Sequence, residues 1–237
     1  MCKKIFAVLG ILFCITFVFS ACSNNTGNVD SSGQAAHSLP TQYDTIIKNI
    51  INSFPWNDDA STVVLENPEL SYMYCHNEEL SDVGFALIDL DNNGQDELII
   101  ADANRPYVYD LYTISGGKIT HLFGSGERYY YILYENGYIE NGWSGSAVTS
   151  GHDFYEFSDG KLNFIERITM DAYHASDVGL FDDIADANED NTFFKSKSDK
   201  PEDYIHISSS EALNAIEAHQ NKNEKLNIEY TLLSEYK

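Results

Sequence analysis

The segment FALIDLDNNGQDELII, residues 85–100, joins two apolar runs through an acidic loop. Residues 85–88 and 98–101 are apolar at every position, which is typical of central strands that are buried on both faces of a sheet. Between them, oxygen-bearing side chains recur at alternate positions, and Gly94 stands where the chain must turn sharply. The segment predicts a buried strand pair connected by a short loop rich in oxygen ligands.

The loop at 89–97 has the spacing of a site for a hard cation. Alternate residues point inward, so a short loop can surround calcium with roughly six or seven oxygens. Three carboxylates near one point would also repel one another without a cation. An acidic turn that holds no ion is the alternative. We predict a structural calcium ion with the ligands Asp89, Asp91, Asn93, Gln95 (through its carbonyl) and Glu97.

The pattern DxDxNGxxE at 89–97 resembles the calcium loops of FG-GAP and VCBS-type repeats and of integrin-like propellers. In those families the loop joins two β-strands, whereas an EF-hand needs flanking helices and a bidentate acid where this chain has Ile100. The run 85–100 is also similar to secreted lipoproteins of Gram-positive gut-type bacteria, and tyrosine-rich hairpins follow it in both. The resemblance implies a β domain and a calcium ion, but no reaction.

Three turn dipeptides predict a series of hairpins after the loop. Gly116-Gly117, Asn136-Gly137 and Asp159-Gly160 each separate two strand-like runs. Asn-Gly and Asp-Gly readily adopt the positive φ angles of tight hairpin turns, so we predict an antiparallel β-meander of about eight strands. A closed propeller needs at least four blades of roughly 40–50 residues, which this meander cannot supply. The sheet is therefore expected to be open or strongly curled.

Helices are expected on both sides of the meander. Apolar residues at helical spacing predict a helix over 41–54, capped by Thr41 and stopped by Pro55. A second helix, 208–221, opens with Ser208 and Glu211 as a capping box and is expected to bury the residues Leu213 and Ile216. Apolar alternation over 226–232 predicts a final strand, and the acidic stretch 170–201 predicts a long loop. The fold class is α+β, mainly β.

The amino terminus has the features of an export signal. Lys3 and Lys4 precede an uncharged apolar stretch, 5–21, which is short for a spanning helix. Residues 19–22, FSAC, resemble the lipobox cut by lipoprotein signal peptidase, although Phe19 replaces the usual leucine. We predict a signal peptide at 1–21, lipid on Cys22 and attachment to the extracytoplasmic face of the cell membrane. An ordinary signal peptide or an uncleaved anchor is the alternative.

The composition of the chain limits its domain organisation, its disulfides and its partners. The stretch 22–40 is polar and small, which predicts a flexible tether before one domain at 41–237. Of four cysteines only Cys75 falls in that domain, so no disulfide can form within it, and a buried inert thiol is expected. The net charge of −23 repels nucleic acid and attracts cations. Nucleic acid is therefore excluded as a partner.

Chemistry-bearing residues elsewhere are weaker signals. The sequence GWSGS at 142–146 differs from a nucleophile elbow at its fifth residue, and His152-Asp153 lies nearby. Adjacent acids such as Glu78-Glu79 could serve a glycosidase, but pairs arise readily among 37 acidic residues. The run 186–192 resembles the first loop but lacks the closing acid. For these residues, an interpretation as solvated surface is favoured over one as a catalytic site.

Aromatic residues cluster on the predicted strands that follow the first hairpin. An exposed aromatic sheet face can stack on sugar rings or contact a protein, although aromatic residues are also simply good strand formers. We predict a non-enzymatic binding or adhesion module for an unidentified protein or glycan, with a cell-envelope hydrolase acting on glycan or peptide as the alternative. The candidate binding face consists of Tyr130, Tyr134, Tyr138 and Trp143.

Overall fold

A computed structural model describes residues 39–56, 74, 76–146, 149–171, 193–198 and 200–237. Leu39–Lys237 form one compact unit. The predicted signal peptide, Cys22, the tether up to residue 38, Cys75 and the acidic run 186–192 lie outside the described residues. Within the described part, no helix is long and apolar enough to cross a membrane.

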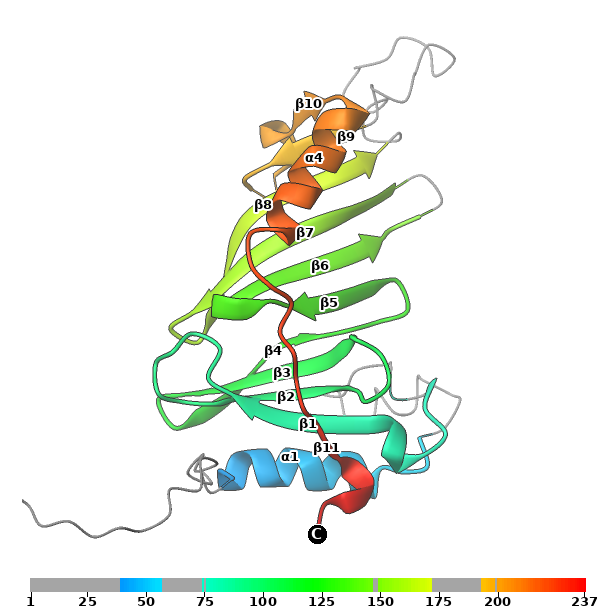
Figure 1. Cartoon of the computed structure of the whole chain (residues 1–237), viewed down its shortest axis with the longest axis vertical. Helices are drawn as coiled ribbons and strands as arrows, with labels where there is room; N and C mark the ends of the chain where they lie inside the picture. The colour runs from blue at the N-terminus through cyan, green and yellow to red at the C-terminus, as the bar shows by residue number, and fades with distance from the viewer. Residues whose placement is uncertain (1–38, 57–73, 75, 147–148, 172–192, 199) are drawn as a thin grey trace, which may run out of the picture. The chain divides into compact units, whose positions relative to one another are not determined.

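The unit is built on one open antiparallel sheet with α-helices at its two ends (Figure 1). The strands follow the order β10-β9-β8-β7-β6-β5-β3-β2-β1-β11, and β4 pairs only with β3, as a branch of the sheet. Their bounds are β1 Val83–Ile88, β2 Glu97–Asp102, β3 Val108–Ser115, β4 Lys118–Gly124, β5 Tyr129–Leu133, β6 Tyr138–Ser144, β7 Thr149–Ser158, β8 Lys161–Asp171, β9 Phe193–Ser196, β10 Ile205–Ile207 and β11 Thr231–Leu232.

The sheet has 11 strands, so the prediction of about eight was too low. The meander itself is confirmed, since β1 to β8 pair antiparallel with their neighbours along the chain except where β4 branches off. The missed strand β9 lies in the stretch predicted as a loop, where four residues leave too short a pattern for periodicity to detect. Beside β9, the strand β10 has only three residues.

All three predicted turn dipeptides have the backbone geometry that hairpins require. The φ angles are 59° and 78° at Gly116-Gly117, 58° and 68° at Asn136-Gly137, and 52° and 72° at Asp159-Gly160. Two consecutive residues with positive φ match the right-handed twist of the flanking strands. The three dipeptides therefore form hairpin turns, as predicted.

The first helix, α1 (Thr41–Asn52), packs on β1, β2 and β3. Its predicted apolar stripe is confirmed, and the buried side chains Tyr43, Ile47 and Ile50 join the core of that end. The predicted cap is wrong, because Thr41 is already helical and Pro40 precedes the helix without a side-chain hydrogen bond. Proline suits this place since its fixed φ angle is preorganised for a helix start.

The second helix, α4 (Ser209–Gln220), covers β8 and β9. Its capping box is confirmed: Glu211 N donates to Ser208 Oγ over 3.2 Å, and Ser208 N donates to Glu211 Oε2 over 2.9 Å. The predicted burial of Leu213 is wrong, because that side chain is 62% exposed. The helix instead turns Ala212, with Ala215, Ile216 and His219 at helical spacing, toward the sheet.

The last segment crosses the molecule from α4 to β1 (Figure 1). The predicted final strand is shorter than expected, since only Thr231 and Leu232 form β11. Before it, Leu226 N donates to Leu133 O over 3.0 Å, and Ile228 and Tyr230 pack on the central core. The alternation of apolar residues over 226–232 therefore reflects side chains that pack on the sheet, and not a long strand that pairs with it. The described residues also form four short 3-10 helices: η2 Leu80–Asp82, η3 Glu135–Gly137, η6 Pro201–Asp203 and η7 Leu233–Glu235.

Candidate functional site

The predicted calcium loop lies between β1 and β2, and its acids converge. Asp89, Asp91 and Glu97 each bring a carboxylate oxygen within 4.8 Å of the others. Asp89 and Asp91 are half-buried, while Glu97 at the start of β2 is fully buried. Among the residues that the structure describes, no ion pair includes any of the three. Three carboxylates thus share a small volume without a cationic side chain.

The loop is shaped by hydrogen bonds to its first acid. Asn93 N donates to Asp89 Oδ1 over 3.0 Å, and Gly94 N donates to Asp89 Oδ2 over 2.8 Å. Gly94 has a φ angle of 88°, which an L side chain rarely adopts, so glycine is required where the sequence predicted a sharp turn. The loop is therefore preformed around the carboxylates.

Glu97 has an unusual environment for an acid. Its Oε2 accepts from Leu90 N over 3.1 Å and its Oε1 from Thr113 Oγ1 over 2.9 Å. Burial raises the pKa of Glu97 to about 7, since these two hydrogen bonds only partly offset desolvation and the carboxylates of Asp91 and Asp89 add to the shift. A nearby cation would reverse this shift.

Asp91 connects the loop to a distant hairpin. Its Oδ2 accepts from Asp159 N, in the β7–β8 turn, over 2.9 Å. Its Oδ1 is buried and has no hydrogen-bond partner. A buried unpaired carboxylate oxygen is costly, and a calcium ion would satisfy it. The chemistry of this donor set therefore fits the predicted ion.

The side chains of Asn93 and Gln95, the other two predicted ligand residues, make bonds within the chain, although the ligand predicted at Gln95 is its carbonyl. Asn93 Oδ1 accepts from Gln95 N over 2.8 Å, and Gln95 Nε2 donates to the carbonyl of Ile114 at the end of β3. These contacts tie the loop to β3. They leave the carboxylates as the part of the predicted ligand set that the structure gathers in one place.

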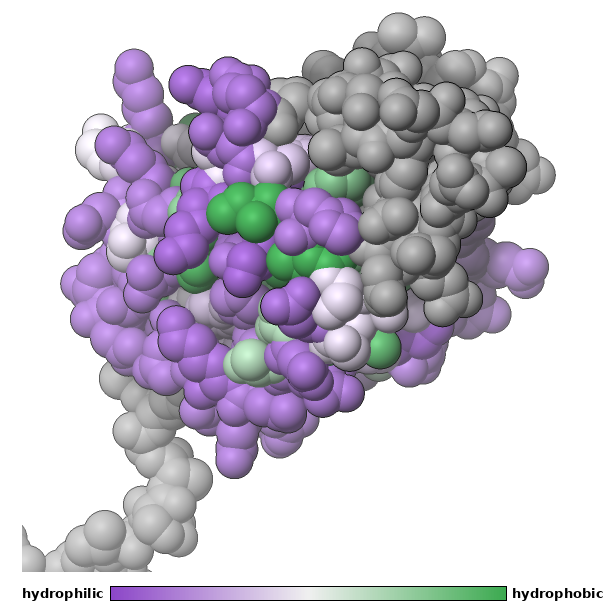
Figure 2. Space-filling view, turned by 90° about the horizontal axis from the view of Figure 1, so that it is seen from above, coloured by the Kyte–Doolittle hydropathy of each residue, from purple (hydrophilic) through white to green (hydrophobic). Residues whose placement is uncertain are grey.

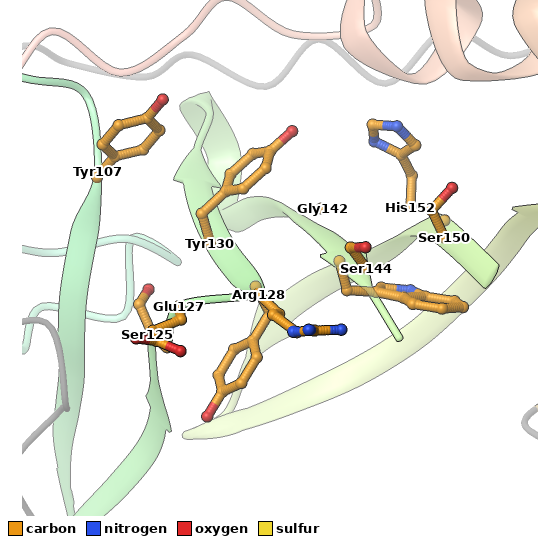
Figure 3. Close-up of a pocket in the computed structure, with 13 residues that line it drawn as sticks. Tyr107, Ser125, Glu127, Arg128, Tyr130, Gly142, Ser144, Ser150 and His152 are labelled. Atoms are coloured by element: carbon orange, nitrogen blue, oxygen red, sulfur yellow. The ribbon is translucent and has the colours of Figure 1, made fainter. Parts of the chain in front are cut away.

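A pocket of about 540 Å³ lies where β5, β6 and β7 meet the β4–β5 connection, and it is drawn in Figure 3. Tyr107, Tyr130, Ser144, Ser150 and His152 are among its walls, and Arg128 and Glu127 come from the β4–β5 connection. The remaining lining residues are Ser125, Gly126, Tyr129, Gly142, Trp143 and Gly151. The pocket thus combines aromatic rings, hydroxyl groups and one imidazole.

His152 is held in the pocket wall by a buried acid. Its Nδ1 lies 2.7 Å from Glu140 Oε1, and Glu140 is fully buried on the neighbouring strand β6. Glu140 also accepts from Tyr134 Oη over 2.6 Å and from Gln220 Nε2, on α4, over 2.9 Å. Burial alone would raise the pKa of Glu140, but these hydrogen bonds hold it below its ordinary value.

The predicted aromatic face is divided by the fold. Tyr130 is 37% exposed and lines the pocket with the half-buried Trp143. Tyr134 and Tyr138, predicted for the same face, are instead buried at 1% and 3% exposure. The hydroxyl of Tyr138 contacts His219 of α4, so the helix covers this part of the sheet. Of the four predicted residues, Tyr130 alone is both exposed and on the same side of the sheet as His152, because Trp143 donates through Nε1 to Asp153 on the opposite side.

The predicted serine and histidine share the pocket without touching. Ser144 Oγ donates to Ser146 O over 3.3 Å, and among the described residues no hydroxyl group forms a hydrogen bond with His152. A second acid, Asp153, points to the opposite face of β7, where Arg167 binds it over 2.7 and 2.6 Å. Histidine and acid at successive positions therefore serve different networks.

The sequence reasoning missed Glu140, Arg167 and the residues of the β4–β5 connection. A single acid within the short β6 pattern gives no sign of its partner, because His152 becomes its neighbour only through the β6–β7 register. Comparisons with models of protein families, with curated proteins and with solved structures find no match for this chain. The assignment of function therefore rests on the two sites themselves.

Proposed function

We propose that this chain is a lipid-anchored binding protein on the extracytoplasmic face of the cell membrane. In this proposal a calcium ion at Asp89, Asp91 and Glu97 stabilises the domain, and the pocket beside Tyr130 receives the ligand. The single observation that carries the proposed binding role is that aromatic rings line an open pocket. Of the four large hydrophobic side chains that are strongly exposed in the described residues, Tyr129 and Tyr130 belong to it.

The character of the protein surface and the size of the pocket support this choice. The surface seen in Figure 2 is mostly hydrophilic, with a few hydrophobic side chains between polar ones. Aromatic groups left open on such a surface mark contact sites, since burying them elsewhere would stabilise the fold. A volume of about 540 Å³ also lies within the range of small-molecule sites.

The proposed calcium ion has a structural role, because the loop is connected to two other parts of the sheet. Asp91 reaches the β7–β8 turn and Glu97 reaches β3. An ion at this place would join the β1–β2 loop to β3 and to the β7–β8 turn. Affinity is expected around 10⁻⁴–10⁻³ M, as in extracellular modules.

Calorimetry and thermal unfolding of the chain from residue 23 onward test the calcium ion. This chain retains the whole compact unit Leu39–Lys237. Calcium should release heat and raise Tm, and both responses should disappear in Asp89→Ala and Glu97→Ala. Glu217→Ala, which removes an exposed acid of α4, serves as the control and should behave like the wild type. Absence of heat and of a Tm shift at millimolar calcium would refute the calcium site.

Mass spectrometry of the exported protein tests the proposed anchor. The mature chain should begin at Cys22 and carry diacylglycerol, and Cys22→Ser should release the protein from the membrane fraction. A mature chain that keeps residues 1–21, or that begins at an unmodified residue, would contradict the lipoprotein assignment.

A cell-envelope hydrolase is the second candidate, favoured by the pair of His152 and Glu140 beside Ser144 and Ser150. A histidine oriented by a carboxylate is the arrangement of a general base. Hydrolysis of nitrophenyl ester or glycoside substrates by the wild type, lost in His152→Ala, would favour this candidate over the binding protein.

A further inference from the structure

We propose that the ligand of the pocket is a neutral carbohydrate whose ring stacks on Tyr130. This inference rests on the proposed function, because it assigns a chemical class to the ligand of the same pocket. It follows from three features: the way the aromatic rings lie on the sheet, the polar groups beside them, and the charge of the surroundings.

The first feature is a pairing of aromatic residues with glycine across neighbouring strands. Tyr130 on β5 pairs with Gly142 on β6, and Trp143 on β6 pairs with Gly151 on β7. A Cβ atom on Gly142 would overlap the ring of Tyr130, and one on Gly151 would lie 2.7 Å from Cζ2 of Trp143. Both rings therefore lie across the backbone of the opposite strand instead of standing away from it.

A ring in this position presents a flat face. One side of the Tyr130 ring rests over Gly142, and the residue remains 37% exposed. The ring of Tyr107 lies 5.8 Å away between centroids and borders the same pocket. The C–H face of a sugar ring is apolar and flat, so it packs on such a surface while its hydroxyl groups stay at the edge.

The second feature is the set of polar groups at that edge. Figure 3 shows Tyr130 and His152 rising from the same side of the sheet, with Ser144 and Ser150 at the ends of β6 and β7. Glu140 occupies Nδ1 of His152 at 2.7 Å, which leaves Nε2 for a ligand. Sugar hydroxyl groups both donate and accept, so they match an imidazole and two serine hydroxyls.

The third feature is charge. The pocket lining contains one permanently charged cation, the guanidinium of Arg128, and one carboxylate, that of Glu127. The chain as a whole carries −23 and repels anionic ligands. A neutral sugar fits both conditions better than an acidic glycan, and a pocket of this size takes a short oligosaccharide better than a folded protein surface.

The test measures binding of the chain from residue 23 onward to immobilised xylan, mannan, starch and desialylated mucin. Each probe is used intact and after periodate, which cleaves vicinal diols, and mucin is also used after protease digestion. Binding to at least one intact probe, lost after periodate and retained after proteolysis, is expected.

Variants locate the binding in the pocket. Tyr130→Ala should weaken binding about tenfold or more through loss of stacking, whereas Tyr130→Phe should bind like the wild type. Gly142→Ala should also weaken it, because the added methyl group displaces the ring. Leu213→Ala, at an exposed apolar residue on α4 outside the pocket, is the matched control and should have no effect.

Two outcomes separate this inference from the function on which it rests. Tyr130-dependent binding to mucin that survives periodate and is lost on proteolysis would overturn the carbohydrate and leave a protein-binding module. Absence of any Tyr130-dependent binding to all four probes would overturn both the carbohydrate and the assignment of the pocket as the ligand site.

Discussion

Two regions of the molecule, the loop at 89–97 and the interior of strands β6 and β7, hold carboxylates in opposite situations. In the loop, Asp91 and Glu97 crowd together with Asp89, and no ion pair with a described basic residue offsets their charge. In the second region, Glu140 and Asp153 are buried, and each contacts a basic side chain, the imidazole of His152 or the guanidinium of Arg167. The difference shows that burial alone does not decide the state of an acid, because its partners do.

The comparison has a direct consequence for function. A paired carboxylate needs nothing from outside the chain, so Glu140 and Asp153 can position side chains for the pocket. An unpaired cluster is complete only when a cation arrives, so the loop at 89–97 is suited to an ion. The carboxylates in β6 and β7 are therefore balanced within the chain, whereas those of the loop at 89–97 depend on an ion from outside it.

The largest expected effect on stability comes from removing the charge of Asp153, which is paired with Arg167. Asp153→Asn should lower the free energy of unfolding by roughly 3–5 kcal/mol, because Arg167 would keep a partly buried charge without its counter-charge. The matched variant Asp91→Asn should leave calcium-free stability unchanged or raise it, since it relieves repulsion. Urea unfolding in the presence of a chelator compares the two variants. Equal losses of unfolding free energy would contradict the distinction between the loop and the acids of β6 and β7.

The next effect is a pH dependence with a defined sign. The pKa of Glu97 is about 7 in the folded chain against an ordinary 4.5, so the native state holds its proton longer than the unfolded state. Its contribution is fully present below about pH 4.5 and is lost as the pH rises to 7, by on the order of 3 kcal/mol.

Calcium-free unfolding between pH 4 and 8 measures this loss, and the difference between the wild type and Glu97→Gln isolates it from other groups. Glu140 has the opposite sign: its lowered pKa means that its contribution is lost on acidification. Identical pH profiles for wild type and Glu97→Gln would show that Glu97 does not titrate in this range.

Calcium should stabilise the domain through the loop at 89–97 alone. At about 10 mM calcium, an affinity in the expected range adds roughly 1.5–3 kcal/mol, or several degrees in Tm. The gain should vanish in Glu97→Gln and persist in Glu140→Gln, and thermal unfolding read by circular dichroism measures both. A gain lost equally in both variants would mean that the ion does not act at the loop.

The smallest effect concerns a single hydroxyl group. Tyr134→Phe removes the 2.6 Å hydrogen bond to Glu140 and should cost about 1.5 kcal/mol, regardless of calcium. Tyr129→Phe, at a residue that is 44% exposed, is the control and should change the unfolding free energy little. A loss of unfolding free energy in Tyr134→Phe that depends on calcium would indicate that Glu140 and the loop at 89–97 are coupled.

Local sequence signals were reliable wherever a few adjacent residues decide the structure. The turn dipeptides, the apolar stripe of α1 and the capping box of α4 all appear as predicted, because backbone sterics and helical spacing act within four residues. The convergence of Asp89, Asp91 and Glu97 belongs to the same class, since one loop supplies all three. The ion itself and the lipid on Cys22 stay predictions.

The tertiary structure decided what depends on distant residues. Which tyrosines stay open was set by α4, which covers Tyr134 and Tyr138 and leaves Tyr130 free, and no property of the tyrosine-rich segment encodes that choice. The meeting of Glu140 with His152 followed from strand register, and that of Asp91 with the β7–β8 turn from the arrangement of the hairpins. Sequence by itself therefore determined the turns, the helices and the acid loop, whereas packing determined the pocket, because contacts between strands exist only once the sheet has formed.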